Sequence, residues 1–210
     1  MNMGKTDIRV GFGYDSHEFK PGVPLRIGGM TLDHPEGLAG HSDGDVLLHA
    51  ITDALLGAVA AGDIGSFFPP GDPRWKDADS AIFLNLALEE LQHAGYRVAN
   101  VDTTLVLAAP KISPIAGEMS ARVADLLGVG MDQVSIKAKT PEGLNLDRAA
   151  QCHAVVLVER VQEPEELKSM EAVIETQRQL EDVVDDLLSQ VHGVPKKRVV
   201  SPVYDTEDIT

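Results

Sequence analysis

Strand-like and helix-like segments alternate along residues 8–160, and this alternation limits the fold more than any other feature of the sequence. Apolar strands are predicted at 8–13, 98–109, 134–139 and 152–158, and amphipathic helices at 46–60, 81–94 and 114–127. A hairpin is expected within 21–33, whereas residues 62–77 hold three prolines and three glycines and are predicted to be a loop. The pattern predicts one α+β domain over residues 7–160, with helices packed on one face of a mixed sheet.

The character of the chain changes after this domain. In residues 161–210, apolar side chains recur every three to seven positions among Glu and Asp, which predicts an amphipathic helix of about eight turns followed by a tail. The apolar positions are Leu167, Met170, Ile174, Leu180, Val184, Leu187 and Val191. We therefore expect an acidic, helical C-terminal extension whose apolar stripe packs on subunits of its own protein rather than on another protein.

Composition excludes several classes of partner. The chain carries 33 acidic against 18 basic residues, a net charge of −15, and only 4% aromatic residues, so nucleic acid is not an expected partner. No apolar run reaches the roughly 18 residues that would span a membrane, and the first residues are too few and too weakly basic for us to expect a leader sequence. We expect a cytoplasmic protein. Cys152 is the only cysteine, which rules out an intrachain disulfide and a thiolate zinc cluster.

Three residues have the side chains of a zinc site. The strand at 8–13 runs into a polar segment at 14–17 that we interpret as a turn. Asp15 and His17 are two positions apart in an extended stretch, so their side chains are expected to point the same way. His49 lies on the first predicted helix. A carboxylate and two imidazoles suit zinc and leave a coordination position open. The spacing is equally compatible with an Asp-x-His turn cap and a histidine of the core or surface.

Other polar residues are candidates for the surroundings of this site. Asp45 and Asp53 lie one helical turn before and after His49 and are predicted to orient its ring. Ser42 or Asp43 is predicted to cap the helix, and a helix N-terminus also attracts phosphate. Lysines at the ends of two predicted strands, with Thr140 and Glu142, suit a phosphate and a divalent cation, or are simply solvated.

In these residues the chain resembles the 2-C-methyl-D-erythritol 2,4-cyclodiphosphate synthase family, from about Arg9 to Val158. The resemblance rests on ordered motifs, of which the block from His41 to Gly65 is highly specific. They are Gly13-Tyr14-Asp15-Ser16-His17, Ile27-Gly28-Gly29, His41-Ser42-Asp43-Gly44-Asp45-Val46 with His49, Thr52-Asp53-Ala54-Leu55-Leu56-Gly57-Ala58, Gly62-Asp63-Ile64-Gly65, Phe68-Pro69, Ala109-Pro110-Lys111 and Lys137-Ala138.

The resemblance implies a homotrimer of ferredoxin-like subunits with active sites at the subunit junctions. It implies zinc held by Asp15, His17 and His49, and a second divalent cation, magnesium or manganese, held by Glu142. His41 and Thr140 take the catalytic positions. The substrate, a cytidyl diphosphate of methylerythritol phosphate, is cyclised with release of CMP. The implied substrate-binding residues are Asp15, His17, His41, Ser42, Asp63, Gly65, Ala109, Pro110, Lys111, Ile112, Ser113, Ala138, Lys139 and Thr140.

The sequence departs from the family pattern in two places. Lys139 stands where the family usually has threonine, with Pro141 after Thr140. Residues 144–151 replace a longer Gly-rich segment whose arginine and glutamate line the trimer's central channel in the family. Arg148 is a candidate substitute for that arginine, and the sequence leaves open whether the channel binds a ligand. Two rival hypotheses use the same pocket: a zinc-dependent phosphohydrolase, and a non-enzymatic trimeric scaffold whose extension docks a partner.

Overall fold

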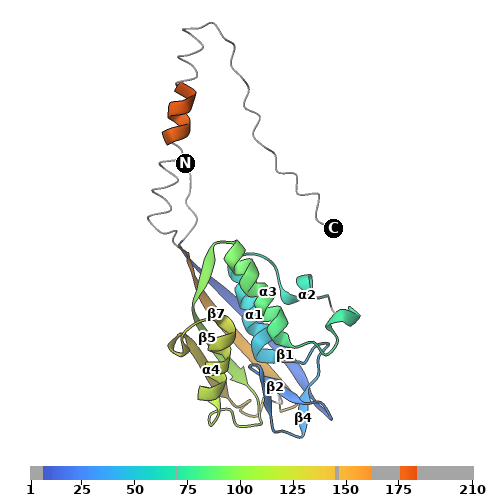
Figure 1. Ribbon diagram of the computed structural model, residues 1–210. Coiled ribbons are helices and arrows are strands. Elements are labelled where there is room, and N and C mark those ends of the chain that lie inside the picture. Colours follow the sequence, from blue (N-terminus) through green and yellow to red (C-terminus); the bar gives the residue numbers. More distant parts are fainter. Residues whose placement is uncertain (1–6, 70, 145–146, 162–175, 184–210) are drawn as a thin grey trace. The chain divides into compact units, whose positions relative to one another are not determined.

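The computed structural model describes residues 7–69, 71–144, 147–161 and 176–183 (Figure 1). The chain divides into two compact units, Met1–Val161 and Gln162–Thr210. In the second unit, residues 176–183 are helical with exposed side chains, Leu180 among them. The rest of the predicted C-terminal helix lies outside the described residues. Among the described helices, none has the length and apolar character needed to cross a lipid bilayer.

A five-stranded mixed sheet forms the frame of the first unit (Figure 1). The strand order is β4 (Glu36–Leu38), β1 (Ile8–Pro21), β7 (Ala149–Arg160), β5 (Tyr96–Val106) and β6 (Val134–Lys139). β7 is antiparallel to both of its neighbours, while β5 and β6 are parallel. A separate hairpin joins β2 (Leu25–Ile27) to β3 (Met30–Leu32), as the sequence predicts.

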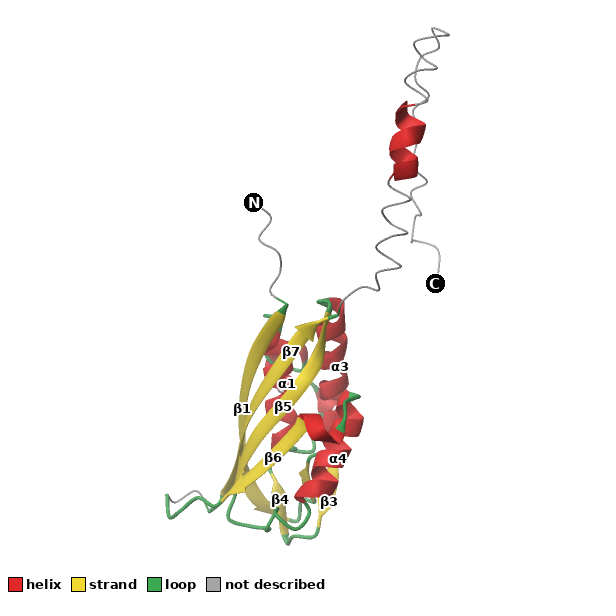
Figure 2. Ribbon diagram, turned by 90° about the vertical axis from the view of Figure 1, so that its left-hand side faces the viewer, coloured by secondary structure: helices red, strands yellow, loops and turns green. Residues whose placement is uncertain are grey.

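The long helices cover one face of this sheet (Figure 2). They are α1 (Val46–Ala58), α3 (Ser80–His93) and α4 (Ala116–Leu127). Alternate residues of β7 from Ala150 to Val158 are fully buried beneath them, while the residues between point to the opposite face. The predicted α+β architecture, with a mixed sheet and helices on one face, is confirmed.

Two local predictions are wrong, and one short strand was missed. Residues 14–17 are not a turn, because β1 continues without interruption to Pro21. The predicted loop at 62–77 contains two short helices, α2 (Ile64–Phe67) and the 3-10 helix η1 (Pro73–Trp75), which begin after the capping carboxylates of Asp63 and Asp72. The short strand β4 was not predicted; a further 3-10 helix, η2 (Met131–Gln133), precedes β6.

β1 and α1 pack so closely that two positions of the strand have no room for a side chain. A Cβ atom built on Gly11 would lie 1.7 Å from the carbonyl oxygen of Ala54, and one on Gly13 would lie 1.9 Å from that of Ala50. Gly11, Gly13, Asp15 and His17 are alternate residues of β1 and therefore share the face that looks toward α1. The glycines bring the helix down onto the strand just before the two polar residues.

Replacement of Gly13 by alanine is expected to destabilise the protein strongly. The new methyl group meets helix backbone, which cannot rotate away, so the helix has to shift, at a cost of about 1–3 kcal/mol or more. Gly57→Ala, in α1, is the matched control: its Cβ would have only the carbonyl oxygen of Phe12 near it, at 3.8 Å. Thermal unfolding should show a lower melting temperature for Gly13→Ala and an equal or higher one for Gly57→Ala. Equal melting of Gly13→Ala and the wild type would contradict the packing argument.

Candidate active site

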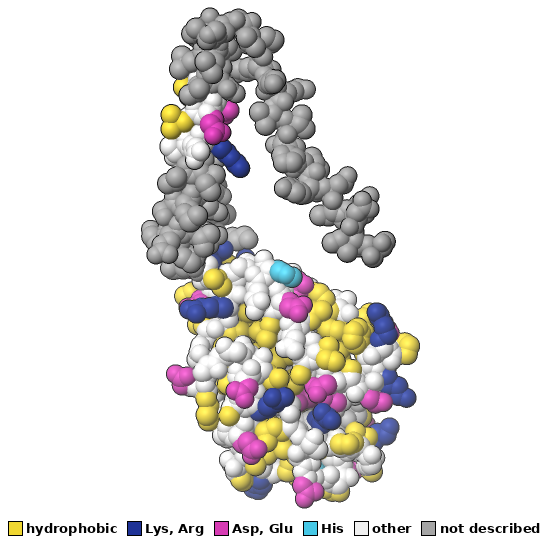
Figure 3. All heavy atoms as spheres, viewed as in Figure 1, with side chains coloured by type: hydrophobic (Ala, Val, Ile, Leu, Met, Phe, Trp, Pro, Cys, Tyr) yellow, Lys and Arg dark blue, Asp and Glu magenta, His cyan; other side chains and the backbone are white. Residues whose placement is uncertain are grey.

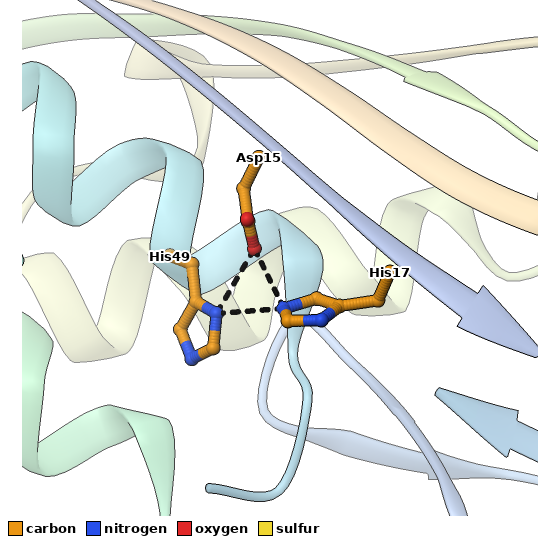
Figure 4. A group of neighbouring side chains, drawn as sticks. All are labelled: Asp15, His17 and His49. Atoms are coloured by element: carbon orange, nitrogen blue, oxygen red, sulfur yellow. Dashed lines mark hydrogen bonds and ion pairs between the residues drawn. The ribbon is translucent and has the colours of Figure 1, made fainter. Parts of the chain in front are cut away.

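The structure brings Asp15, His17 and His49 together at one point between β1 and α1 (Figure 4). Asp15 Oδ2 lies 2.8 Å from His17 Nε2 and 3.0 Å from His49 Nδ1, and the two ring nitrogens are 3.1 Å apart. One possible ligand atom from each residue lies within 4.8 Å of the others. The three side chains therefore can share one metal ion, as the sequence predicts for this set.

The charges at this point depend on one another. Burial by itself would raise the pKa of Asp15, but hydrogen bonds from His17 and His49 and the charges of these rings outweigh it and hold that pKa far below its usual value. Burial would lower the pKa of His17, yet the hydrogen bond and charge of Asp15 raise it above the usual 6.5. In the metal-free protein, the negative charge of Asp15 and the positive charge of His17 therefore stabilise each other.

A cavity of about 280 Å³ opens beside the three residues. Its polar wall holds Asp15, His17, His41, Ser42, His49 and Gly65. Its apolar wall includes an aromatic cluster that was not singled out from the sequence, in which the Phe68 ring lies 4.3 Å from Phe83 and 4.8 Å from Trp75, centroid to centroid. Among the described residues, the indole Nε1 of Trp75 is buried without a hydrogen-bond partner. The cavity can hold a small molecule with both polar and apolar parts.

The residues before α1 are placed differently from the prediction. Neither Ser42 nor Asp43 caps the helix; the N-cap is Asp45, whose side chain accepts from the amides of Leu47 and Leu48. The same carboxylate accepts from Gly28 at 2.9 Å and Gly29 at 2.7 Å, which ties the β2–β3 hairpin to the helix. Burial raises the pKa of Asp45 despite these four bonds.

His49 is not oriented by the two predicted carboxylates. Asp45 makes the backbone contacts just described, and Asp53 accepts a hydrogen bond of 2.8 Å from the amide of Ile64. Burial raises the pKa of Asp53. The Nε2 atom of His49 instead lies 2.8 Å from Ser80 Oγ and 3.1 Å from Ser42 Oγ. Ser80 was missed because a serine at the start of a helix is typical of capping, and nothing in the sequence relates it to a histidine 31 positions earlier.

The remaining predicted residues near this cavity lie before α1 and at the start of α2. His41 is exposed, and its Nε2 lies 2.8 Å from the carbonyl oxygen of Asp72. Asp63 caps α2 and accepts two bonds from Ser66, which lower the pKa of Asp63. Gly65, two residues further on in α2, lines the cavity.

A second, smaller pocket of about 110 Å³ lies where β5 and β6 end. Its lining includes Pro110, Lys111, Ile112, Ser113, Ala138, Lys139 and Thr140. Ala109 precedes Pro110 through a cis peptide bond. The exposed Glu142 accepts a hydrogen bond from the Thr140 hydroxyl. This pocket shares no lining residue with the first one, and two strands, β7 and β5, separate β1 from β6 in the sheet. The structure does not bring the two groups of predicted residues together within one chain.

Comparison with known proteins identifies relatives over the whole first unit. The model of the YgbB family matches residues 8–159. The 2-C-methyl-D-erythritol 2,4-cyclodiphosphate synthase of Koribacter versatilis is 65% identical over 153 residues, which are 73% of this chain and 99% of that protein. A solved structure of a synthase with this name has a TM-score of 0.68 at 40% identity and covers 72% of this chain and 100% of its own. Another solved structure of a synthase with this name, described as the bound form with CDP, also has a TM-score of 0.68, at 38% identity and with the same coverage of both chains.

The ion pair between Asp15 and His17 predicts a pH dependence of the metal-free protein. The pKa of Asp15 is lowered on folding, so its contribution to stability is present above the unfolded value of 3.8 and is lost in acid. The pKa of His17 is raised, so its contribution is complete below 6.5 and is lost as the pH rises through the folded pKa. Both contributions are complete only between these two unfolded values, and each fades gradually outside them.

With a chelator present, the melting temperature of the wild type should therefore exceed that of His17→Gln most clearly in this window, and the difference should shrink above it. His93→Gln, at the exposed end of α3, is the control and should follow the wild type throughout. A difference between wild type and His17→Gln that does not change with pH would contradict the ion pair.

Proposed function

Because the chain belongs to the YgbB family, whose matched relatives are 2-C-methyl-D-erythritol 2,4-cyclodiphosphate synthases, we propose that it catalyses the reaction for which they are named. It converts 4-diphosphocytidyl-2-C-methyl-D-erythritol 2-phosphate into the cyclic diphosphate and CMP, a step of non-mevalonate isoprenoid biosynthesis. The observation that carries this proposal is the meeting of Asp15, His17 and His49 beside a cavity with polar and apolar walls.

The reaction is an intramolecular phosphoryl transfer of the phosphorus–oxygen lyase type. An oxygen of the 2-phosphate forms a bond to the β-phosphorus, and the bond from that phosphorus to the oxygen bridging the two phosphates breaks. The electron pair leaves with CMP. Because the nucleophile is already an anion, no strong base is required, and the protein's task is to position two anionic groups and offset their repulsion.

We assign zinc to the cluster of Asp15, His17 and His49. One carboxylate and two imidazoles are donors that zinc accepts, and their ligand atoms are close enough to share an ion. When bound, zinc supplies positive charge to a phosphoryl oxygen. A second divalent cation, magnesium or manganese, is assigned to Glu142, whose carboxylate is exposed and held by Thr140. Hard cations of this type prefer oxygen ligands.

The other residues bind the parts of the substrate. In the first cavity, His41 and Ser42 hold the methylerythritol phosphate, and Asp63 with Gly65 binds the ribose. In the second pocket, residues 109–113 read the cytosine, and Ala138, Lys139 and Thr140 contact the diphosphate. His41 and Thr140 touch the reacting phosphates. The assignment is supported by the lining of the two pockets, although Asp63 and Ala109 stand beside rather than in them.

We further propose a homotrimer with active sites at the subunit junctions. Two features support it. The two pockets lie apart in one chain, so a substrate that needs both requires a second subunit to supply one of them. On the sheet face opposite the helices, β1 and β7 present apolar side chains to solvent: Val10 is 63% and Phe12 62% exposed, and Tyr14 and Val155 are also exposed. Contiguous apolar patches of this kind mark protein interfaces.

No nucleic-acid or membrane partner is proposed. On the face shown in Figure 3, acidic and basic side chains are interspersed rather than gathered into a basic stripe. The cytoplasmic location expected from the sequence stays a prediction.

Incubation with the cytidyl diphosphate substrate, zinc and magnesium should yield CMP and a cyclic diphosphate, detected by phosphorus NMR. The activity of His49→Ala should fall by more than about 10- to 100-fold, which is the loss typical when a residue behind a metal ligand is changed. The loss should be larger here because the metal ligand itself is removed. His93→Ala is the control and should retain activity. CMP together with an open methylerythritol bisphosphate, formed by attack of water on the β-phosphorus, would indicate the phosphohydrolase instead, and an inactive wild type would favour the scaffold.

Phe12→Glu should separate the subunits, because three charges would be buried where the open sheet faces meet in the trimer. Light scattering should report the mass of a monomer, and activity should fall with it, since each active site loses its second pocket. Ile82→Glu is the matched control, because Ile82 is 48% exposed and lies on α3, on the helical side of the sheet. A trimeric and active Phe12→Glu variant would refute this interface.

A further inference from the structure

The ring nitrogen of His49 that faces away from Asp15 and His17 has its own buried partner. His49 Nδ1 looks toward Asp15 and His17, so it is the nitrogen available to a metal (Figure 4). The opposite atom, Nε2, lies 2.8 Å from the hydroxyl oxygen of Ser80. Ser80 is the first residue of α3 and is completely buried.

Asp43 fixes the direction of this hydrogen bond. The Ser80 hydroxyl donates its single proton to Asp43 Oδ1, because an ionised carboxylate can only accept. Toward His49 the same oxygen can then only accept, so Nε2 must carry the proton. Asp43 is held in place by the amides of Ser80, at 3.2 Å, and Asp45, at 3.3 Å, with the Arg26 guanidinium 4.0 Å away.

We propose that Ser80, oriented by Asp43, is a positioning residue that keeps a proton on Nε2 of His49, so that Nδ1, which gives up its hydrogen bond to Asp15, is the nitrogen that binds the metal. The inference rests on the proposed metal site and names a function for a serine and an aspartate outside the set assigned to substrate and metals. A ligating histidine commonly donates its second ring N–H to such an outer partner, which fixes both tautomer and ring orientation.

Ser42 is the competing acceptor, since its hydroxyl lies 3.1 Å from the same nitrogen. Two observations favour Ser80. Ser80 is nearer and its proton is committed to Asp43, whereas Ser42 lies in the wall of the cavity, where it is available to the substrate. The two serines therefore have different roles: Ser80 orients the ring of His49, and Ser42 faces the ligand in the cavity.

The test compares Ser80→Ala with Ser42→Ala and with Ser120→Ala, which removes another buried hydroxyl, in α4. Zinc affinity of the full chain is measured by competition with a coloured chelator, without substrate. Ser80→Ala should bind zinc about 10- to 100-fold more weakly, the usual effect of losing an outer partner. The other two variants should bind zinc like the wild type.

A spectroscopic readout separates positioning from general destabilisation. In the zinc-loaded protein labelled with ¹⁵N-histidine, the Nε2 proton of His49 should exchange slowly with solvent in the wild type and in Ser42→Ala, and rapidly in Ser80→Ala. The proposal would be overturned if Ser80→Ala kept both the zinc affinity of the wild type and the slow exchange of the proton. It would also be overturned if Ser42→Ala alone lost both properties. Because neither measurement uses substrate, failure of the cyclisation assay would refute the proposed function without deciding this point.

Asp43→Asn keeps the test decisive if Ser80→Ala does not fold, which circular dichroism would report. The amide has the shape of the carboxylate but lacks its charge, so it weakens the commitment of the Ser80 proton. Folded Asp43→Asn should bind zinc more weakly than the wild type and should exchange the His49 Nε2 proton faster. Both changes should be smaller than those caused by Ser80→Ala, which removes the hydroxyl altogether. Unchanged affinity and exchange in Asp43→Asn would refute the role of the pair.

Discussion

The close contact between β1 and α1 determines the geometry of the proposed active site. Gly11 and Gly13 let the helix backbone rest directly on the strand, and the same strand face continues with Asp15 and His17. His49 directly precedes Ala50, whose carbonyl oxygen occupies the space that a side chain at Gly13 would need. The three proposed ligands are therefore positioned by backbone packing, which is more rigid than positioning by flexible side chains or loops.

The electrostatics of the site follow from the same burial. The chain carries a net charge of −15, and the proposed substrate is itself an anion. In the metal-free protein the charge of Asp15 is balanced by the histidines that surround it, and Asp43 is balanced by hydrogen bonds and by Arg26. The cavity thus offers ligands rather than positive charge, and bound cations have to supply the attraction for phosphate.

The sequence predicted those features that depend on local periodicity. The helices α1, α3 and α4 were expected from their apolar spacing, and Asp15 and His17 were expected to share a face because a strand repeats every two residues. Features decided by distant contacts were not predictable. Ser42, Asp43 and Asp45 are all of residue types that commonly cap helices. Only Asp45 caps α1, and its carboxylate also accepts from the distant amides of Gly28 and Gly29. The contact of Ser80 with His49 depends in the same way on how α3 packs.

The separation of the two pockets has a genetic consequence. If each active site combines the first cavity of one subunit with the second pocket of its neighbour, a defect in either half is confined to the junctions that use it. Consider a trimer that mixes subunits with a damaged metal cluster and subunits with a damaged cytidine pocket. At one junction of that trimer, an intact metal cluster would meet an intact cytidine pocket. Two inactive alleles of this gene would then complement each other when they are expressed in the same cell.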